Sequence, residues 1–127
     1  MPMEYVKTDK APLPAGPYSQ ATNVGGRIFT AGQIPVDPGT GELVAGGVGI
    51  QTGQAMENLR EVLKAAGSDM KYITKIVLFV KDLNNLNTIN EVYSKYFDCA
   101  YPARTCVEVS RLPKDAELEI EAVAFVP

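Results

Sequence analysis

The fold class of this chain follows from one strand-like stretch, YITKIVLFV, at residues 72–80. Successive side chains of a strand point to opposite faces. Ile76, Leu78 and Val80 therefore share one face, and Val77 and Phe79 share the other. Both faces are apolar, and a strand that is apolar on both faces must be covered on both.

Only two helices are available as cover. Residues 51–66 carry apolar side chains at three- and four-residue spacing, which predicts a helix that ends before Gly67. A second helix is predicted to begin after Asn84 or Asn85 and to end before Pro102. Its buried stripe consists of Leu86, Ile89, Val92, Tyr93, Tyr96 and Phe97. Two helices cover one face of a sheet but not both, so the second face requires another subunit.

Four further stretches predict strands. Residues 19–23 and 28–34 flank a turn at 24–27, and residues 104–110 and 117–125 end the chain. Gly32 interrupts its strand, which indicates a bulge or the close approach of another group, although a glycine required only for packing has the same pattern. We expect a single α+β domain over residues 1–127. Its mixed sheet has five or six strands with two helices on one face, and the domain is an obligate homo-oligomer.

Composition narrows the function classes. The 127 residues suggest one domain, and the formal charge of −3 argues against duplex nucleic acid as a partner. No apolar run is long enough to span a bilayer, and residues 1–15 lack the apolar core of a signal peptide. Two cysteines are too few for a disulfide scaffold. A reducing, cytoplasmic location is the expectation.

The chain contains no histidine, which removes Ser-His and Cys-His nucleophile pairs and all His-containing metal sites. Any general acid or base must be a carboxylate, Lys, Tyr, Cys or a positioned water. Glu119 and Glu121 lack the loop spacing of a Mg²⁺ or Ca²⁺ site. The glycines at 47–53 do not complete a dinucleotide-binding motif, because Thr52 stands at the third glycine position.

Arg104 is the first candidate site residue. It follows Pro102 at a strand end, and alternation places its side chain on the same face as Cys106. A guanidinium held there can donate two parallel hydrogen bonds to a small carboxylate, although a solvated strand-end arginine has the same pattern. Cys106 could be a nucleophile near Arg104, but a small buried residue whose backbone lines a pocket is the favoured interpretation.

The last strand supplies a candidate carboxylate. Leu118, Ile120, Ala122 and Ala124 alternate with a second set that changes from acidic to apolar. This second set contains Glu117, Glu119, Glu121, Val123 and Phe125. We expect the first set under the helices, and Glu119 or Glu121 at the edge of the oligomer interface near Arg104 on a neighbouring strand. Periodicity does not choose between these two glutamates, and an exposed or ion-paired carboxylate has the same pattern.

Several ordered motifs extend over nearly the whole chain. They are GPYSQ at 16–20, TAGQIP at 30–35, VKDL at 80–83, NEVY at 90–93, PARTCVEV at 102–109, RLPKD at 111–115 and EIE at 119–121. In these motifs the chain resembles the RidA (YjgF-type) enamine/imine deaminases. The resemblance implies a homotrimer of chorismate-mutase-like α+β sandwiches with a central β-barrel and three clefts between subunits.

The resemblance also implies roles for residues. Arg104 would bind the substrate carboxylate and Glu119 would orient or activate the attacking water. Tyr18 would border the cleft, and the backbone at Gly32 and Cys106 would contact the ligand. Two positions depart from the family pattern: Ala31, where some deaminases have serine, and Leu86, where an aromatic residue often lines the cleft.

The implied reaction is hydrolysis of 2-aminoacrylate, 2-iminopropanoate or related 2-imino acids to 2-keto acids and ammonia, the activity of a 2-iminobutanoate/2-iminopropanoate deaminase. No cofactor or metal is implied, because the imine itself is the electrophile. The alternative is a non-catalytic ligand-binding or regulatory trimer that uses the same cleft. A ribonuclease fits poorly, since the chain is acidic and has no histidine.

Overall fold

The stretch at residues 72–80 forms β4 (Ile73–Val80), an inner strand of a six-stranded mixed sheet, in a computed structural model that describes residues 1–127. The strand order is β1-β2-β3-β6-β4-β5, and only the β4–β5 pair is parallel. The other strands are β1 (Met3–Val6), β2 (Ala21–Val24), β3 (Arg27–Thr30), β5 (Ala103–Glu108) and β6 (Leu118–Phe125). The prediction of a mixed sheet of five or six strands is confirmed, with six strands present.

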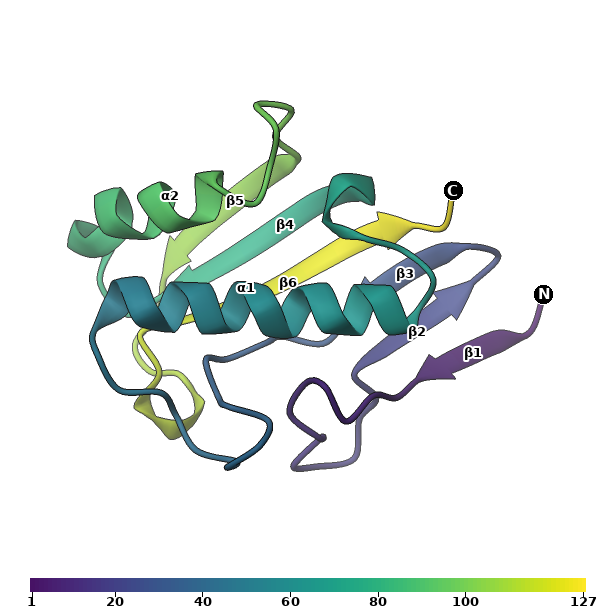
Figure 1. Ribbon diagram of the computed structural model, residues 1–127, viewed down its shortest axis with the longest axis horizontal. Helices are drawn as coiled ribbons and strands as arrows, with labels where there is room; N and C mark the ends of the chain where they lie inside the picture. The colour runs from purple at the N-terminus through teal and green to yellow at the C-terminus, as the bar shows by residue number, and fades with distance from the viewer.

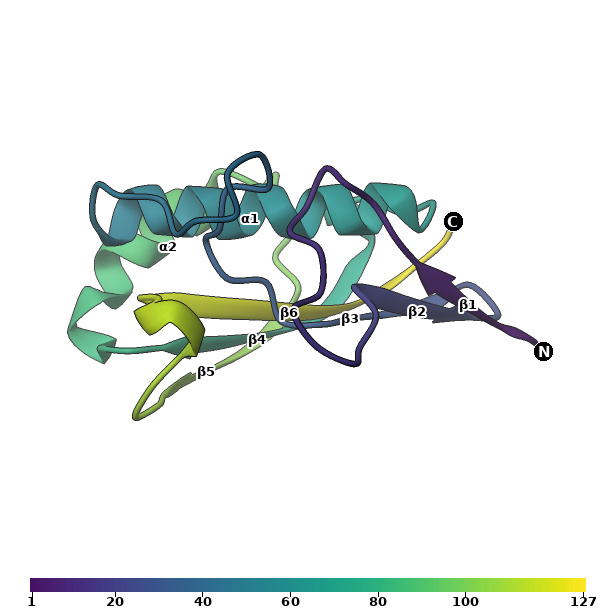
Figure 2. The same ribbon diagram turned by 90° about the horizontal axis from the view of Figure 1, so that it is seen from below.

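Both α-helices pack on the same face of the sheet (Figures 1 and 2). They are α1 (Val48–Ala65), which crosses the middle of the sheet, and α2 (Leu86–Ser94), which lies beside it over β4 and β5. The core between the two layers includes Met56, Leu59, Val62, Leu63, Ile76, Leu78, Ile89, Leu118 and Ile120, all fully buried. The alternation predicted for β4 and β6 therefore places the expected residues beneath the helices.

The other face of the sheet has no cover within the chain, as Figure 2 shows. Phe29 is 45% exposed, Phe125 42% and Val107 39%, and Val77 and Phe79 beside them are only half-buried. These apolar side chains come from β3, β4, β5 and β6, and Lys75, Thr105, Glu119 and Glu121 lie among them on the same face. We call this side of the sheet the open face.

Glycine turns set the register of the first strands. Gly25 and Gly26 both have positive φ, at 59° and 84°, and join β2 to β3 in a two-residue hairpin. The short edge strand β1 was not predicted, because its four residues MEYV are mostly exposed and carry no strong alternation. β3 ends at Thr30, earlier than predicted, and Gln33 rejoins β6 by an isolated bridge to Ile120.

The loop that follows Gln33 is held to α1 by one buried amide. Asn58 Nδ2 donates to the carbonyl oxygens of Ile34 and Val36, at 3.0 and 2.8 Å, and Asn58 Oδ1 accepts from Gln54 Nε2. Unpaired carbonyls buried away from water cost free energy. Asn58 therefore fixes the segment that begins at Gly32.

Neither helix is long and apolar enough to cross a membrane.

Asn58→Ala is expected to lower the free energy of unfolding by about 1–3 kcal/mol, because the Val36 carbonyl loses its side-chain donor and the Ile34 carbonyl keeps only the Val36 N–H. Urea unfolding followed by circular dichroism measures the change. The matched control is Asn87→Ala in α2, where the asparagine is exposed and makes no side-chain hydrogen bond. Equal losses in the two variants would contradict the role assigned to Asn58.

Candidate functional site

Arg104 lies on the helix face of the edge strand β5. Its register partner on β4 is Ile76, which is buried under the helices, and Cys106 pairs in the same way with Leu78. The prediction that Arg104 and Cys106 share a face is therefore confirmed. Because β5 is the last strand of the sheet, the Arg104 side chain reaches α2 at the margin of the molecule.

Two residues of α2 hold the Arg104 guanidinium. Its Nη1 donates to Asn90 Oδ1 at 2.8 Å. The Arg104 Cζ lies 4.8 Å from the centre of the Tyr93 ring, within the range of a cation–π contact. These residues line a pocket of about 310 Å³ together with Ser94, Tyr101 and Pro102. A cationic pocket of this size suits a small anionic ligand.

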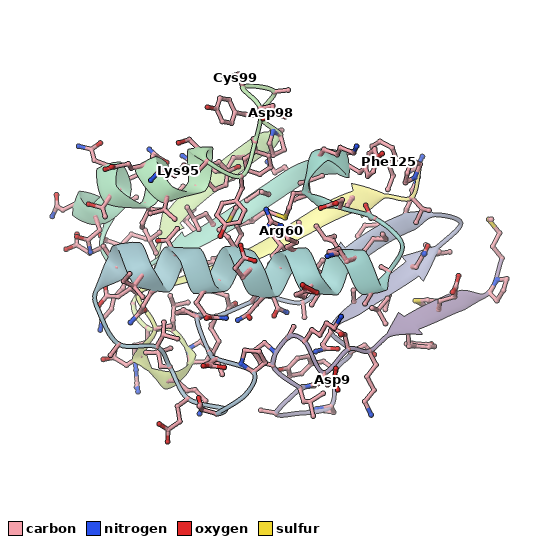
Figure 3. The ribbon with its side chains drawn as sticks, viewed as in Figure 1. Asp9, Arg60, Lys95, Asp98, Cys99 and Phe125 are labelled. Carbon is pink, nitrogen blue, oxygen red and sulfur yellow. The ribbon has the colours of Figure 1, made fainter.

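The Cys106 side chain is half-buried beside Arg104. Burial raises the pKa of the Cys106 thiol, and the nearby Arg104 charge only partly offsets that effect. The thiol is therefore protonated near neutral pH, which disfavours a nucleophilic role. Cys99 lies at the tip of the loop that projects beyond the sheet between α2 and β5, as Figure 3 shows, and both cysteines are free.

Glu119 lies on the open face of β6. Its register partner on β4 is Phe79, and Phe79 in turn pairs with Val107 on β5. Burial raises the pKa of Glu119, and the neighbouring Glu121 carboxylate raises it further. Glu119 is thus a carboxylate in an apolar row with an elevated proton affinity, as a general base requires.

The Glu119 carboxylate packs directly against the backbone of Gly32. A Cβ at Gly32 would collide with the carboxyl group of Glu119, so only glycine fits there without displacement. The group that approaches Gly32 closely is thus the Glu119 side chain, which packs where a Cβ would lie. The interruption of β3 at this point makes room for the carboxylate.

Tyr18 and Gly32 line a second cavity, of about 360 Å³. Tyr18 is 54% exposed, and its hydroxyl accepts a hydrogen bond from the Ala15 N–H at 3.3 Å. Ala31 adjoins this cavity and donates its N–H to the Gln20 carbonyl, whereas Leu86 packs against the core at the start of α2. The remaining lining residues are Pro12, Leu13, Ala15, Gln20, Gln33, Ile34, Val36, Pro38, Gly41 and Lys114.

The candidate residues form two groups on opposite faces of the sheet. Arg104 and Cys106 face the helices, whereas Glu119 faces away from them. The expectation that Glu119 or Glu121 approaches Arg104 on a neighbouring strand is wrong within one chain, because β4 separates β5 from β6 and the side chains point in opposite directions. A site that uses both groups cannot be completed by a single chain.

The sequence did not single out Asn90 and Tyr93 as site residues. They are three positions apart on α2 and therefore lie on the same side of the helix. Tyr93 was placed on the buried stripe, which is correct, but only tertiary packing shows that this stripe also meets Arg104. No group of three or more Asp, Glu or Cys side chains suitable for a metal ion occurs in the structure.

Residues 8–126 match the family model described as Endoribonuclease L-PSP, and the chain belongs to this RidA (YjgF-type) family. A RutC family protein of Pyrococcus abyssi is 51% identical over 98% of both chains. The human protein named 2-iminobutanoate/2-iminopropanoate deaminase is 47% identical over 94% of this chain and 88% of its own length. The fold is similar to the crystal structure of Escherichia coli TdcF with bound serine, with a TM-score of 0.92, 46% identity and coverage of 96% and 98%.

Gly32→Ala is expected to lower the free energy of unfolding and to displace Glu119, because the added methyl group occupies the carboxylate's position. Gly53→Ala in α1 is the matched control, since its Cβ would meet Val92 only at an ordinary 4.0 Å. That helical substitution should stabilise by about 0.5–1 kcal/mol. Thermal unfolding of both variants measures the difference. A stabilising Gly32→Ala would show that the carboxylate moves aside without cost.

Proposed function

We propose that this chain is a hydrolytic deaminase of small 2-imino acids, among them 2-iminopropanoate, which forms from 2-aminoacrylate. The observation that carries the proposal is the Arg104 pocket, in a chain whose relatives include proteins named for this activity. The products are a 2-keto acid and ammonia. Arg104 and Glu119 are the proposed catalytic residues, with Tyr18, Ala31, Gly32, Leu86 and Cys106 around the substrate.

Arg104 is proposed to bind the substrate carboxylate. One of its terminal nitrogens is engaged by Asn90, and its plane rests on Tyr93. This arrangement limits the rotation of the guanidinium while donors remain for a carboxylate. A substrate held in this way presents its imine carbon in a fixed position, which lowers the entropic cost of attack.

The second half of each site is proposed to come from another copy of the chain, in a homotrimer. Glu119 lies on the open face, which is apolar and uncovered. If the open face of one copy packs against the β5 edge of the next, burial of that face and the meeting of Glu119 with Arg104 follow from one contact. Tyr18 and Gly32, which share a cavity, would approach the site from the Glu119 side.

Glu119 is proposed to orient the attacking water and accept its proton. The water oxygen forms a bond to the imine carbon as Glu119 takes one of its protons, and the imine nitrogen takes up that proton from Glu119, giving a carbinolamine. The carbinolamine hydroxyl then passes its proton through Glu119 to the amino nitrogen, the C–N bond breaks, the C=O bond forms and ammonia leaves. The net change converts C=NH and water into C=O and NH₃, with no oxidation or reduction.

The alternative is a trimer that binds a small carboxylate without turnover. The specific observation in its favour is the bound serine of the TdcF structure, because it shows a relative occupied by an amino acid. The printed family description names an endoribonuclease. We propose that RNA is not the substrate here, because the net charge is −3 and no histidine is present for general acid–base catalysis.

Wild-type protein is expected to accelerate the loss of 2-iminopropanoate generated in situ by a pyridoxal-dependent dehydratase. In the presence of Arg104→Ala, 2-iminopropanoate should disappear at the rate seen in buffer alone. The deaminase activity of Arg104→Lys should be about 100-fold or more below that of wild type, because lysine keeps the charge but not the planar fork that orients the carboxylate. Full activity of Arg104→Lys would contradict the anchoring role. Buffer-rate decay with wild-type protein would leave the binding-only alternative.

Glu119→Gln should abolish turnover, whereas Glu121→Gln should retain it. Wild-type activity should fall as the pH drops through the pKa of Glu119, which lies above the ordinary glutamate value of about 4.3, because the protonated acid cannot accept a proton. Glu121→Gln removes the neighbouring charge, so this acidic limb should move to lower pH. Initial rates from pH 4 to 8 measure both effects. Wild-type rates with an unchanged pH profile in Glu119→Gln would refute the assignment of Glu119 as the general base.

The same substitutions test stability and assembly. Because the folded state raises the pKa of Glu119, ionisation costs stability as the pH rises, and Glu119→Gln should be as stable as wild type or more so at neutral pH.

Inactive Arg104→Ala and Glu119→Gln chains, refolded together, should regain up to about one quarter of wild-type activity through intact sites between subunits. No recovery in mixed assemblies would contradict a shared site.

A further inference from the structure

The Tyr93 hydroxyl is buried and makes no hydrogen bond. Tyr93 lies on α2 and is 5% exposed. Its Oη is the one buried side-chain polar atom of the chain that has no hydrogen-bond partner. Other buried polar side chains are satisfied, such as the Gln20 and Asn58 amides, which bind backbone groups. An unpaired buried hydroxyl costs stability, and phenylalanine would fill the same space without that cost.

The hydroxyl belongs to a residue that lines the Arg104 pocket. Tyr93 shares this pocket with Asn90, Ser94 and Tyr101, and the Arg104 guanidinium rests on its ring at 4.8 Å. Burial raises the pKa of Tyr93, and the Arg104 guanidinium, which lies close to the hydroxyl without the geometry of a hydrogen bond, lowers it in part. The phenol therefore keeps its proton at neutral pH and is available as a donor.

Arg104 is held by two contacts from α2. Its Nη1 donates to Asn90, and its Cζ lies over the Tyr93 ring, whose hydroxyl is buried. Because the hydroxyl is buried, a ligand oxygen can reach it only when a neighbouring group moves, and the Arg104 guanidinium is the charged group beside it.

We propose that the Tyr93 hydroxyl is a further hydrogen-bond donor to the carboxylate of a small 2-imino or 2-oxo acid held by Arg104. The inference rests on the proposed carboxylate anchor and adds a residue to it. The guanidinium fork donates two hydrogen bonds and the phenol a third, so the three donors surround both oxygens. Such a clamp prefers a carboxylate to an uncharged amide, which carries only one good acceptor.

Tyr93→Phe tests this inference, because it removes the hydroxyl and preserves the ring under Arg104. Hydrogen bonds to charged groups contribute enough that the variant should bind pyruvate about 10- to 100-fold more weakly than wild type. Its melting temperature should equal or exceed that of wild type, since the unpaired hydroxyl is gone. Isothermal titration with pyruvate, and with pyruvamide as the uncharged analogue, measures binding by the full-length protein.

Tyr96→Phe is the matched control from the same segment. The Tyr96 hydroxyl donates to Glu57 Oε2 at 2.6 Å, and Tyr96 does not line the Arg104 pocket. This variant should lose stability but bind pyruvate as wild type does. A second measurement uses ¹³Cζ-labelled tyrosine, in which the resonance absent from Tyr93→Phe should shift when pyruvate is added to wild-type protein.

Weaker pyruvate binding by Tyr93→Phe at undiminished stability supports the inference, even if wild-type protein fails to accelerate imine decay and the deaminase proposal falls. Unchanged binding by Tyr93→Phe, with binding lost in Arg104→Ala, overturns the inference and leaves the anchor intact. Absence of pyruvate binding by wild-type protein, or a Tyr93 resonance that stays in place, also overturns it.

Discussion

A six-stranded sheet with two apolar faces and helical cover for only one is the constraint on which the rest of this structure depends. Ile76, Leu78 and Ile120 are fully buried beneath α1 and α2. Phe29 and Phe125 remain partly exposed on the open face, although the Tyr72 ring lies 5.3 Å from that of Phe125. Apolar area of this extent is costly in water, so the same pattern that builds the core also calls for a partner.

This two-sidedness divides the candidate site. Arg104 points to the helix face because β5 continues the alternation of β4 beside it, and Glu119 points to the open face for the same reason on β6. Neither orientation can change without moving core residues out of register. Assembly and chemistry are therefore joined in the proposed function: the contact that buries the open face also brings a carboxylate to the arginine.

Both groups of site residues contain features that an isolated stable fold would avoid. Glu119 is a partly buried carboxylate next to Glu121, and it fits only because residue 32 has no side chain. Tyr93 buries a hydroxyl without a partner under a guanidinium. Each feature lowers the stability of the fold. They occur within reach of Arg104 or of the proposed water site, where a ligand would satisfy them.

The sequence alone determined the two-layer α+β arrangement, because period-2 and period-3.6 patterns report which face of each element is apolar. The motif from Pro102 to Val109 and the motifs around it were enough to indicate the family, and with it Arg104 and Glu119 as candidates. Only the tertiary structure decided the strand order, which inserts β4 between β5 and β6 and separates those two residues. It also decided the pairing of Asn90 and Tyr93 with Arg104, because contacts between distant segments depend on packing and leave no local signal in the chain.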